Sequence, residues 1–333
     1  STTLLDCHLI NSGSLQWMSG IFFINGSSVV ENTGTWLASG ASVTMQTGVF
    51  INSGTLTVSG ANVVFFAFVN STGSITVSAG SLVLNGGGHM CGCGSGGVVV
   101  VIQINIGATL VLNTGSFTFP TGVSVIGSGS LIVRNEVVLV TIDTQFNIGT
   151  GGSIVIRDNA NVTFGAGTNT TDTCAPIQTR DNCTVQWPAC TTYRFAAIQF
   201  NGGTYVMAAC AELVIVVDIQ IVSGVLIIEG TFTTIVSSTT VLIGGQVNCG
   251  GKIVIGGSCG WQGSQIIGGG SVWLGGSTII SGPGDKQCNG PTLINTGTVE
   301  WQEGTIVLIG GSTCQNNGTF TIGVAVSCSA SVT

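Results

Sequence analysis

The sequence predicts an all-β protein, a single-stranded parallel β-helix (a solenoid) of about 14–15 rungs. Three observations predict this fold: a short turn motif that recurs at a nearly constant interval, short runs of alternating apolar residues between the turns, and a scarcity of charge. Charged residues make up 6% of the chain and hydrophobic residues 44%. Because a disordered chain has the opposite balance, the composition favours an ordered, β-rich protein.

The turn motif is Asn-x-Gly, and the first four copies follow one another at nearly equal intervals, with their glycines at positions 13, 34, 54 and 73. A period of about twenty residues is typical of a chain that coils into stacked turns. Serine replaces the asparagine in the fourth copy. The copies are Asn11-Ser12-Gly13, Asn32-Thr33-Gly34, Asn52-Ser53-Gly54, Ser71-Thr72-Gly73, Asn295-Thr296-Gly297 and Asn316-Asn317-Gly318.

The segments between the turns predict two or three short strands per rung. Residues 54–73 alternate apolar and polar positions in runs too short for a helix. We expect Val, Ile, Leu and Phe to point inward, and Gly and Asn to supply corners of positive φ. Residues 130–136 align without gaps on residues 153–159, so equivalent side chains should lie about 4.8 Å apart in adjacent rungs.

The repeats predict one β-helix domain over residues 1–333, interrupted by a disulfide-rich excursion at about 165–194. That segment holds three cysteines, two glycosylation sequons and two prolines. The longest apolar runs are far shorter than the roughly 20 residues of a spanning helix, so no membrane span is predicted. The net charge of −7 argues against nucleic acid as a partner.

An even number of cysteines and several sequons predict a secreted, extracellular protein at a cell surface or in a surface appendage. We expect every cysteine to form a disulfide and every sequon to be a candidate for an attached N-glycan. The cysteines are Cys7, Cys91, Cys93, Cys174, Cys183, Cys190, Cys210, Cys249, Cys259, Cys288, Cys314 and Cys328. The sequon asparagines are Asn25, Asn70, Asn161, Asn169, Asn182 and Asn317.

Cysteines about one rung apart are candidates for bonds between rungs, as for Cys288 with Cys314 and Cys183 with Cys210. A metal site is the alternative for the group formed by His89, Cys91 and Cys93. Structural zinc usually takes a wider cysteine spacing and a fourth ligand, so the sequence favours disulfides there. No metal site and no cofactor are predicted.

The most specific charged feature is an evenly spaced ladder of arginines, Arg134, Arg157 and Arg180. Guanidinium groups at rung spacing repel one another unless anions lie between them. Glu136, Asp158 and Asp181 follow the arginines closely, which indicates a surface ladder of arginines and acids. The alternative is an anion-binding or uronate-binding strip, since arginine presents a planar fork to carboxylates.

No catalytic residue is predicted, and the protein is not expected to be an enzyme. Polysaccharide lyases and hydrolases need clustered carboxylates, whereas here they are scattered singly and neither His8 nor His89 has an evident acid partner. Tryptophans in repeat-like contexts favour packing within the rungs over a platform for sugar binding. These are Trp17, Trp36, Trp261, Trp273 and Trp301.

Two segments carry a resemblance to a known class of repeats. They are Leu293-Ile-Asn-Thr-Gly-Thr-Val-Glu-Trp-Gln-Glu-Gly-Thr-Ile and Leu9-Ile-Asn-Ser-Gly-Ser-Leu-Gln-Trp-Met-Ser-Gly-Ile. They resemble the Asn-x-Gly-Thr…Trp-x-x-Gly repeats of large extracellular β-helix proteins of protists and bacteria. The resemblance implies a surface or extracellular β-solenoid and carries no catalytic residues.

Rung-like sequence runs close to both ends of the chain, and no amphipathic capping helix is evident there. Because uncapped solenoid ends invite pairing, we expect a structural protein that stacks head to tail with itself into an extracellular, glycosylated filament. A carbohydrate-binding or adhesive β-helix is the first alternative. A polysaccharide lyase or hydrolase is the second.

Overall fold

The computed structural model describes residues 2–330 except residues 6–7, 26–27, 41, 61, 92–99, 136–138, 144, 150, 167, 171–175 and 189. The described residues form strands joined by tight turns and contain no helix. The strands pair in parallel and stack as a β-solenoid of about 14 turns, which confirms the predicted fold class. The chain divides into two compact units, residues 1–176 and 177–333, and each is described by itself.

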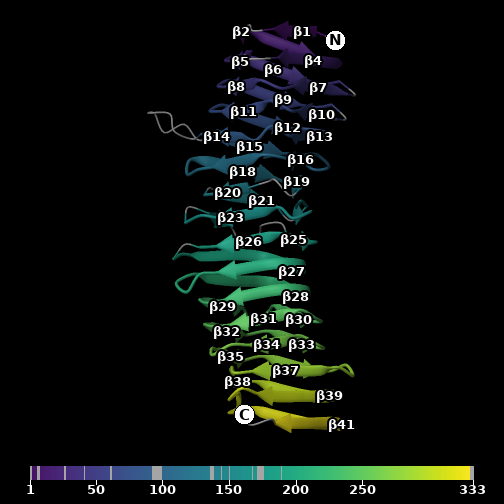
Figure 1. Cartoon of the computed structure of the whole chain (residues 1–333), viewed down its shortest axis with the longest axis vertical. Helices are drawn as coiled ribbons and strands as arrows, with labels where there is room; N and C mark the ends of the chain where they lie inside the picture. Colours follow the sequence, from purple (N-terminus) through teal and green to yellow (C-terminus); the bar gives the residue numbers. More distant parts are fainter. Residues whose placement is uncertain are drawn as a thin grey trace. The chain divides into compact units, whose positions relative to one another are not determined.

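In unit 1 each turn contributes one short strand to each of three faces, and a strand pairs with its equivalents in the turns before and after it (Figure 1). Face 1a consists of β1 (Thr2–Leu5), β4 (Gly20–Asn25), β7 (Val43–Gln46), β10 (Val63–Phe65), β13 (Ser81–Leu84), β16 (Thr109–Leu112), β19 (Ser130–Arg134) and β22 (Ser153–Arg157). Face 1b consists of β2 (His8–Asn11), β5 (Val29–Asn32), β8 (Val49–Asn52), β11 (Phe68–Ser71), β14 (Gly88–Met90), β17 (Ser116–Phe119), β20 (Leu139–Ile142) and β23 (Asn161–Phe164). Face 1c consists of β3 (Ser14–Trp17), β6 (Thr35–Ala38), β9 (Thr55–Val58), β12 (Ser74–Val77), β15 (Val100–Ile104), β18 (Val123–Gly127), β21 (Gln145–Ile148) and β24 (Asn169–Thr170).

Unit 2 follows the same plan, but its longer strands continue around a corner and serve more than one face. For example, three successive segments of the single strand β28 pair with β29, β30 and β31. The strands of unit 2 are β25 (Ile177–Arg180), β26 (Thr184–Trp187), β27 (Thr192–Met207), β28 (Glu212–Ile228), β29 (Thr231–Thr234), β30 (Thr239–Leu242), β31 (Gln246–Cys249), β32 (Lys252–Ile255), β33 (Ser258–Trp261), β34 (Gln265–Ile267), β35 (Ser271–Leu274), β36 (Ser277–Ile280), β37 (Asp285–Asn289), β38 (Thr292–Asn295), β39 (Thr298–Ile309), β40 (Thr313–Asn316) and β41 (Thr319–Ala330).

The core of each unit lies inside the coil, because alternate residues of every short strand point inward. In β9 and β12 the inward residues are fully or almost fully buried, whereas the outward threonines and serines are partly exposed. Near the start of unit 1 the core contains a column of aromatic rings. Trp36 lies edge-on to Phe50, and Phe50 lies edge-on to Phe65, with ring centroids 5.4 and 5.3 Å apart.

The glycine of the Asn-x-Gly motif is required for a reason other than the expected positive φ. Neither Gly34 nor Gly54 has a positive φ. A Cβ atom on Gly34 would lie 2.1 Å from the carbonyl oxygen of Gly13, and one on Gly54 would lie 2.1 Å from that of Gly34. The motif therefore lets successive turns approach each other too closely for any side chain.

One turn of unit 1 is longer than its neighbours. Ser81 pairs with Thr109, whereas the steps before and after it, from Val63 to Leu82 and from Thr109 to Ser130, are shorter. This turn includes residues 92–99, which lie outside the described residues. The strands before and after it pair in register, so the added length does not disturb the pairing.

The segment predicted as an excursion, about 165–194, contains strands in both units. In unit 1, β24 pairs with β21. In unit 2, β25 and β26 both pair with β27, so residues 177–187 follow the regular course of the coil. Cys174, which was predicted to staple this segment, lies outside the described residues.

Candidate functional site

The Asn-x-Gly motifs build a continuous polar ladder inside unit 1, at the corner between faces 1b and 1c. The side-chain amide of Asn11 donates to Oδ1 of Asn32 over 2.8 Å, and that of Asn32 donates to Oδ1 of Asn52 over 2.8 Å. The amide of Asn52 then donates to Oγ of Ser71 over 3.0 Å. Asn32, Asn52 and Ser71 are completely buried. Serine fits the fourth position because its hydroxyl accepts this bond and can donate to the carbonyl of Gly73 in the same turn, 3.1 Å away.

Each ladder asparagine also secures the backbone of the following turn. Nδ2 of Asn32 donates to the carbonyl of Thr55, and Nδ2 of Asn52 to that of Ser74. In return, the carbonyl oxygen of Asn52 accepts bonds from the backbone amides of Thr72 and Gly73. The motif thus satisfies buried polar groups that the chain creates wherever it turns a corner inside the stack.

The same arrangement recurs in the last turns of unit 2. The amide of Asn295 donates to Oδ1 of Asn316 over 2.7 Å and to the carbonyl of Thr319 over 2.9 Å. Both ladders are directional, since each amide donates toward the turn that follows it in sequence. Among the described residues, Oδ1 of Asn11 accepts no hydrogen bond and Nδ2 of Asn316 donates none. These two turns therefore present an unused acceptor and an unused donor.

Two of the three ladder arginines lie side by side at the edge of face 1a. Arg134 pairs with Arg157 in the register of β19 and β22. Nε of Arg134 donates to Oδ1 of Asn113 over 2.7 Å, and Nε of Arg157 lies 3.5 Å from Oδ2 of Asp158. Arg180 belongs to unit 2, where it is exposed and pairs with Asn201. Glu136 lies outside the described residues.

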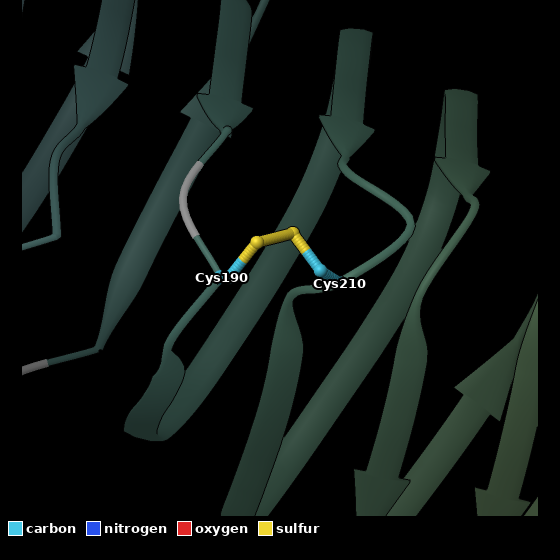
Figure 2. Close-up of a disulfide and its surroundings, with 2 residues drawn as sticks. All are labelled: Cys190 and Cys210. Atoms are coloured by element: carbon cyan, nitrogen blue, oxygen red, sulfur yellow. A yellow bond between two sulfur atoms is a disulfide. The ribbon is translucent and has the colours of Figure 1, made fainter.

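One disulfide forms among the described residues, between Cys190 and Cys210 (Figure 2). The two cysteines occupy equivalent corners one turn apart, just before β27 and β28, and their Cα atoms are 4.6 Å apart. The suggested pairing of Cys183 with Cys210 is therefore wrong. Cys183 points into the core instead, where its sulfur lies 3.8 Å from the hydroxyl oxygen of Tyr205.

Five other cysteines form no disulfide among the described residues, and most of them are buried. They are Cys91, Cys183, Cys249, Cys259 and Cys288. Burial raises the pKa of the Cys259 thiol to about 12, and burial together with the nearby Cys314 raises the pKa of Cys288 to about 12. Disulfides beyond Cys190–Cys210 stay a prediction; Cys7, Cys93, Cys174 and the side chain of Cys328 lie outside the described residues.

Nothing in the described part of the chain gathers three or more His, Cys, Asp or Glu side chains that could hold a metal ion. Nδ1 of His89 makes a hydrogen bond to the hydroxyl of Thr118 on the neighbouring strand, and Cys93 lies outside the described residues. His8 has an acid partner that the sequence did not reveal, because Nε2 of His8 lies 3.1 Å from Oε2 of Glu31. The pair joins equivalent strands of adjacent turns, so aligning the sequence with itself at an offset of about one turn would have found it.

The predicted glycosylation sites differ in exposure. Asn182 and Asn317 are exposed and lie in the tight turns after β25 and β40. Asn70 and Asn161 lie within strands and are only partly exposed, and Oδ1 of Asn161 is buried without a hydrogen-bond partner. The side chains of Asn25 and Asn169 lie outside the described part of the structure.

The tryptophans mostly pack inside the coil, as the sequence predicts. Trp36, Trp261 and Trp301 are buried, and Trp17 is partly exposed in the first turns. Trp273 differs, because it points outward from β35 and carries Nζ of Lys252 at 4.8 Å from its ring centroid. The ammonium group covers the ring, so this outward tryptophan is engaged in a cation–π contact.

No protein-family model matches the chain, and neither a curated protein nor a solved structure shows significant similarity to it. Within the described ranges, no helix is long and apolar enough to cross a membrane. The family relationship suggested by the repeats therefore depends on the motifs and the fold alone.

Proposed function

We propose that this chain is a secreted structural protein whose copies stack head to tail into an extracellular filament. The observation that carries the proposal is the direction of the asparagine ladder. Among the described residues, the ladder of unit 1 begins with an unused acceptor, Oδ1 of Asn11, and the separate ladder of unit 2 ends with an unused donor, Nδ2 of Asn316. The two turns are complementary to each other and neither is complementary to itself, as a head-to-tail contact requires.

The register of the joint follows from the pairs inside the chain. Asn295 pairs with Asn316, and Asn11 pairs with Asn32, in parallel strands. If β2 of a second copy follows β40 in the same register, Nδ2 of Asn316 donates to Oδ1 of Asn11. Since Asn11 also donates to the carbonyl of Thr35, which pairs with Ser14, the second acceptor for Asn316 is the carbonyl of Ser14.

Apolar surface at the same two turns supports this joint. Trp17, Phe22 and Trp36 line a hollow in the first turns of unit 1. In the last turns of unit 2, Leu308 and Phe320 line a cavity of about 130 Å³. A stacked copy would cover both hollows, and removing such apolar surface from water favours association.

Two further features favour an extracellular setting. The Cys190–Cys210 disulfide is stable in an oxidising compartment. Two sequons, at Asn182 and Asn317, are exposed and thus accessible to glycosylation. Together with the Asn-x-Gly-Thr…Trp-x-x-Gly pattern, these features support our proposal that the chain is related to the extracellular β-helix repeat proteins of protists and bacteria.

Electron microscopy of the purified, secreted chain tests the proposal. We expect filaments whose number and length rise with concentration, and fibre diffraction from aligned filaments with a reflection near about 4.8 Å along the axis. Asn316→Asp removes the free amide donor and places a carboxylate opposite the Asn11 acceptor, so it should shorten or abolish the filaments. Gln315→Glu, which adds the same charge at the neighbouring position and leaves the sequon at Asn317 intact, is the matched control. A monodisperse monomer at high concentration would overturn the proposal.

A further inference from the structure

A second polar column runs along the edge of face 1a, and its composition changes partway. Asn85 and Asn113 directly follow the paired residues Leu84 and Leu112. Arg134 occupies the next position, one turn after Asn113, and Arg157 the position after that. The column therefore passes from side chains that both donate and accept hydrogen bonds to side chains that only donate.

Because of this change, Arg157 lacks the side-chain oxygen acceptor that Asn113 and Arg134 each find one turn earlier in the column. The amide of Asn113 donates to Oδ1 of Asn85 over 2.8 Å, and Nε of Arg134 donates to Oδ1 of Asn113 over 2.7 Å. Arg157 follows another arginine, which offers no acceptor. Its Nε is buried and, among the described residues, makes no hydrogen bond. A buried donor in this state is a costly exception in a folded protein.

The local charge is also unbalanced in the described structure. The two arginines occupy paired positions of adjacent strands, and paired strands lie about 4.8 Å apart. Asp158 is the one carboxylate of the described residues within ion-pair distance of either arginine. Its side chain is 48% exposed, and Oδ2 lies 3.5 Å from Nε of Arg157, so water screens the pair. The Arg157 side chain as a whole is 34% exposed, so an added anion can reach the guanidinium group from outside and balance the charge.

The rest of the same face indicates what would carry that anion. Ser130, Ile132 and Arg134 alternate along β19 on its outer side, as Ser153, Val155 and Arg157 do along β22. The face thus presents three parallel columns, one of hydroxyl groups, one of aliphatic groups and one of cations. Oγ of Ser153 lies 3.0 Å from Oγ of Ser130, which keeps the hydroxyl column in register.

We propose that Arg134 and Arg157 bind the carboxylate of an acidic saccharide that lies across β19 and β22. Sugar rings combine C–H faces, which suit Ile132 and Val155, with hydroxyl groups, which suit Ser130 and Ser153. A carboxylate presents two oxygens in a plane and matches the fork of a guanidinium group. The site lies on one face of unit 1 and does not depend on stacking, so it adds a ligand to the proposed filament.

Calorimetric titration of the full chain with a galacturonate hexasaccharide tests the site, and the neutral methyl ester of the same hexasaccharide and inorganic sulfate serve as comparison probes. We expect the acid form to bind, its affinity to fall with added salt, and the methyl ester and sulfate to bind at least about tenfold more weakly. Arg134→Gln and Arg157→Gln should each lower the affinity about tenfold or more. Arg194→Gln removes the same charge from unit 2 and should change it less than twofold.

Arg157→Lys separates charge from geometry, because lysine keeps the charge and loses the planar fork; we expect an affinity between wild type and Arg157→Gln. Circular dichroism of each variant confirms that the coil is intact. The inference is overturned if the wild-type chain does not bind the acid hexasaccharide, if the methyl ester or sulfate binds as tightly, or if Arg194→Gln weakens binding as much as Arg157→Gln. None of these outcomes bears on filament formation.

Discussion

Replacing Asn52 tests whether the buried asparagine ladder stabilises the coil. Its side chain makes three hydrogen bonds: it accepts one from Asn32 and donates one each to Ser71 and the carbonyl of Ser74. Asn52 is completely buried, so in Asn52→Ala its former hydrogen-bond partners are left unpaired and water does not replace the lost bonds. At about 1 kcal/mol for each lost bond, and about 1 kcal/mol more for the stranded groups, we expect a loss of about 4 kcal/mol in the free energy of unfolding.

Urea unfolding of wild type and variant measures this loss. Asn316→Ala is the matched control, because Asn316 also accepts ladder bonds but is exposed, and it should cost less than about 1 kcal/mol. Hydrogen exchange at Thr72 and Gly73, whose amides bond the carbonyl of Asn52, should accelerate in Asn52→Ala alone.

Asn52→Asp adds a second readout. When protonated, the new carboxyl can replace both the acceptor and a donor of the amide, whereas the charged form is buried without a cation. Its folded pKa should thus lie above the usual value of about 4. The stability of this variant should be greatest below about pH 4 and fall as the pH rises through the folded pKa. The reasoning is refuted if Asn52→Ala costs no more than Asn316→Ala.

Three further predictions concern other parts of the chain. Gly54→Ala should lower the melting temperature strongly, because its Cβ would lie 2.1 Å from a backbone oxygen, whereas Gly13→Ala, with no atom within 4 Å, should change it little. Burial raises the pKa of Cys259 from 9.0 to about 12 in the folded chain. The stability that the buried neutral thiol contributes is therefore present below pH 9 and lost between pH 9 and 12. Urea unfolding at several pH values should show a smaller alkaline loss of stability in Cys259→Ala. In the secreted protein, mass spectrometry should find glycan at the exposed Asn182 and Asn317, and an unmodified Asn161 would agree with its burial.

The period of the sequence was enough to predict the fold. An interval of about twenty residues that holds short alternating runs is compatible with few architectures, and every inward position in β9 and β12 agrees with it. The register of Arg134 with Arg157 was also predictable, because the gapless alignment of residues 130–136 on residues 153–159 fixes it. Periodicity specifies which residues are equivalent, and equivalent residues are neighbours in a coil.

Periodicity does not specify where a side chain points at a corner, and the predictions that proved wrong concern corner residues. Cys183 and Cys210 are about one turn apart, but Cys183 enters the core while Cys190 reaches Cys210. The glycine of Asn-x-Gly was assigned to positive φ, whereas close approach of the neighbouring turn requires it. The direction of the ladder and the unpaired Nε of Arg157 depend on individual hydrogen bonds, which a repeat pattern does not determine.

The long turn between Ser81 and Thr109 has a consequence for how such a chain can change over time. The strands on either side keep their pairing register although this turn is longer than its neighbours. Each short strand of unit 1 pairs with the equivalent strands of adjacent turns, so a change of length between two strands does not shift the pairing along the coil. Segments can thus be gained, lost or grafted between two strands, as between β14 and β15, while the scaffold stays the same, which separates the evolution of inserted segments from that of the fold.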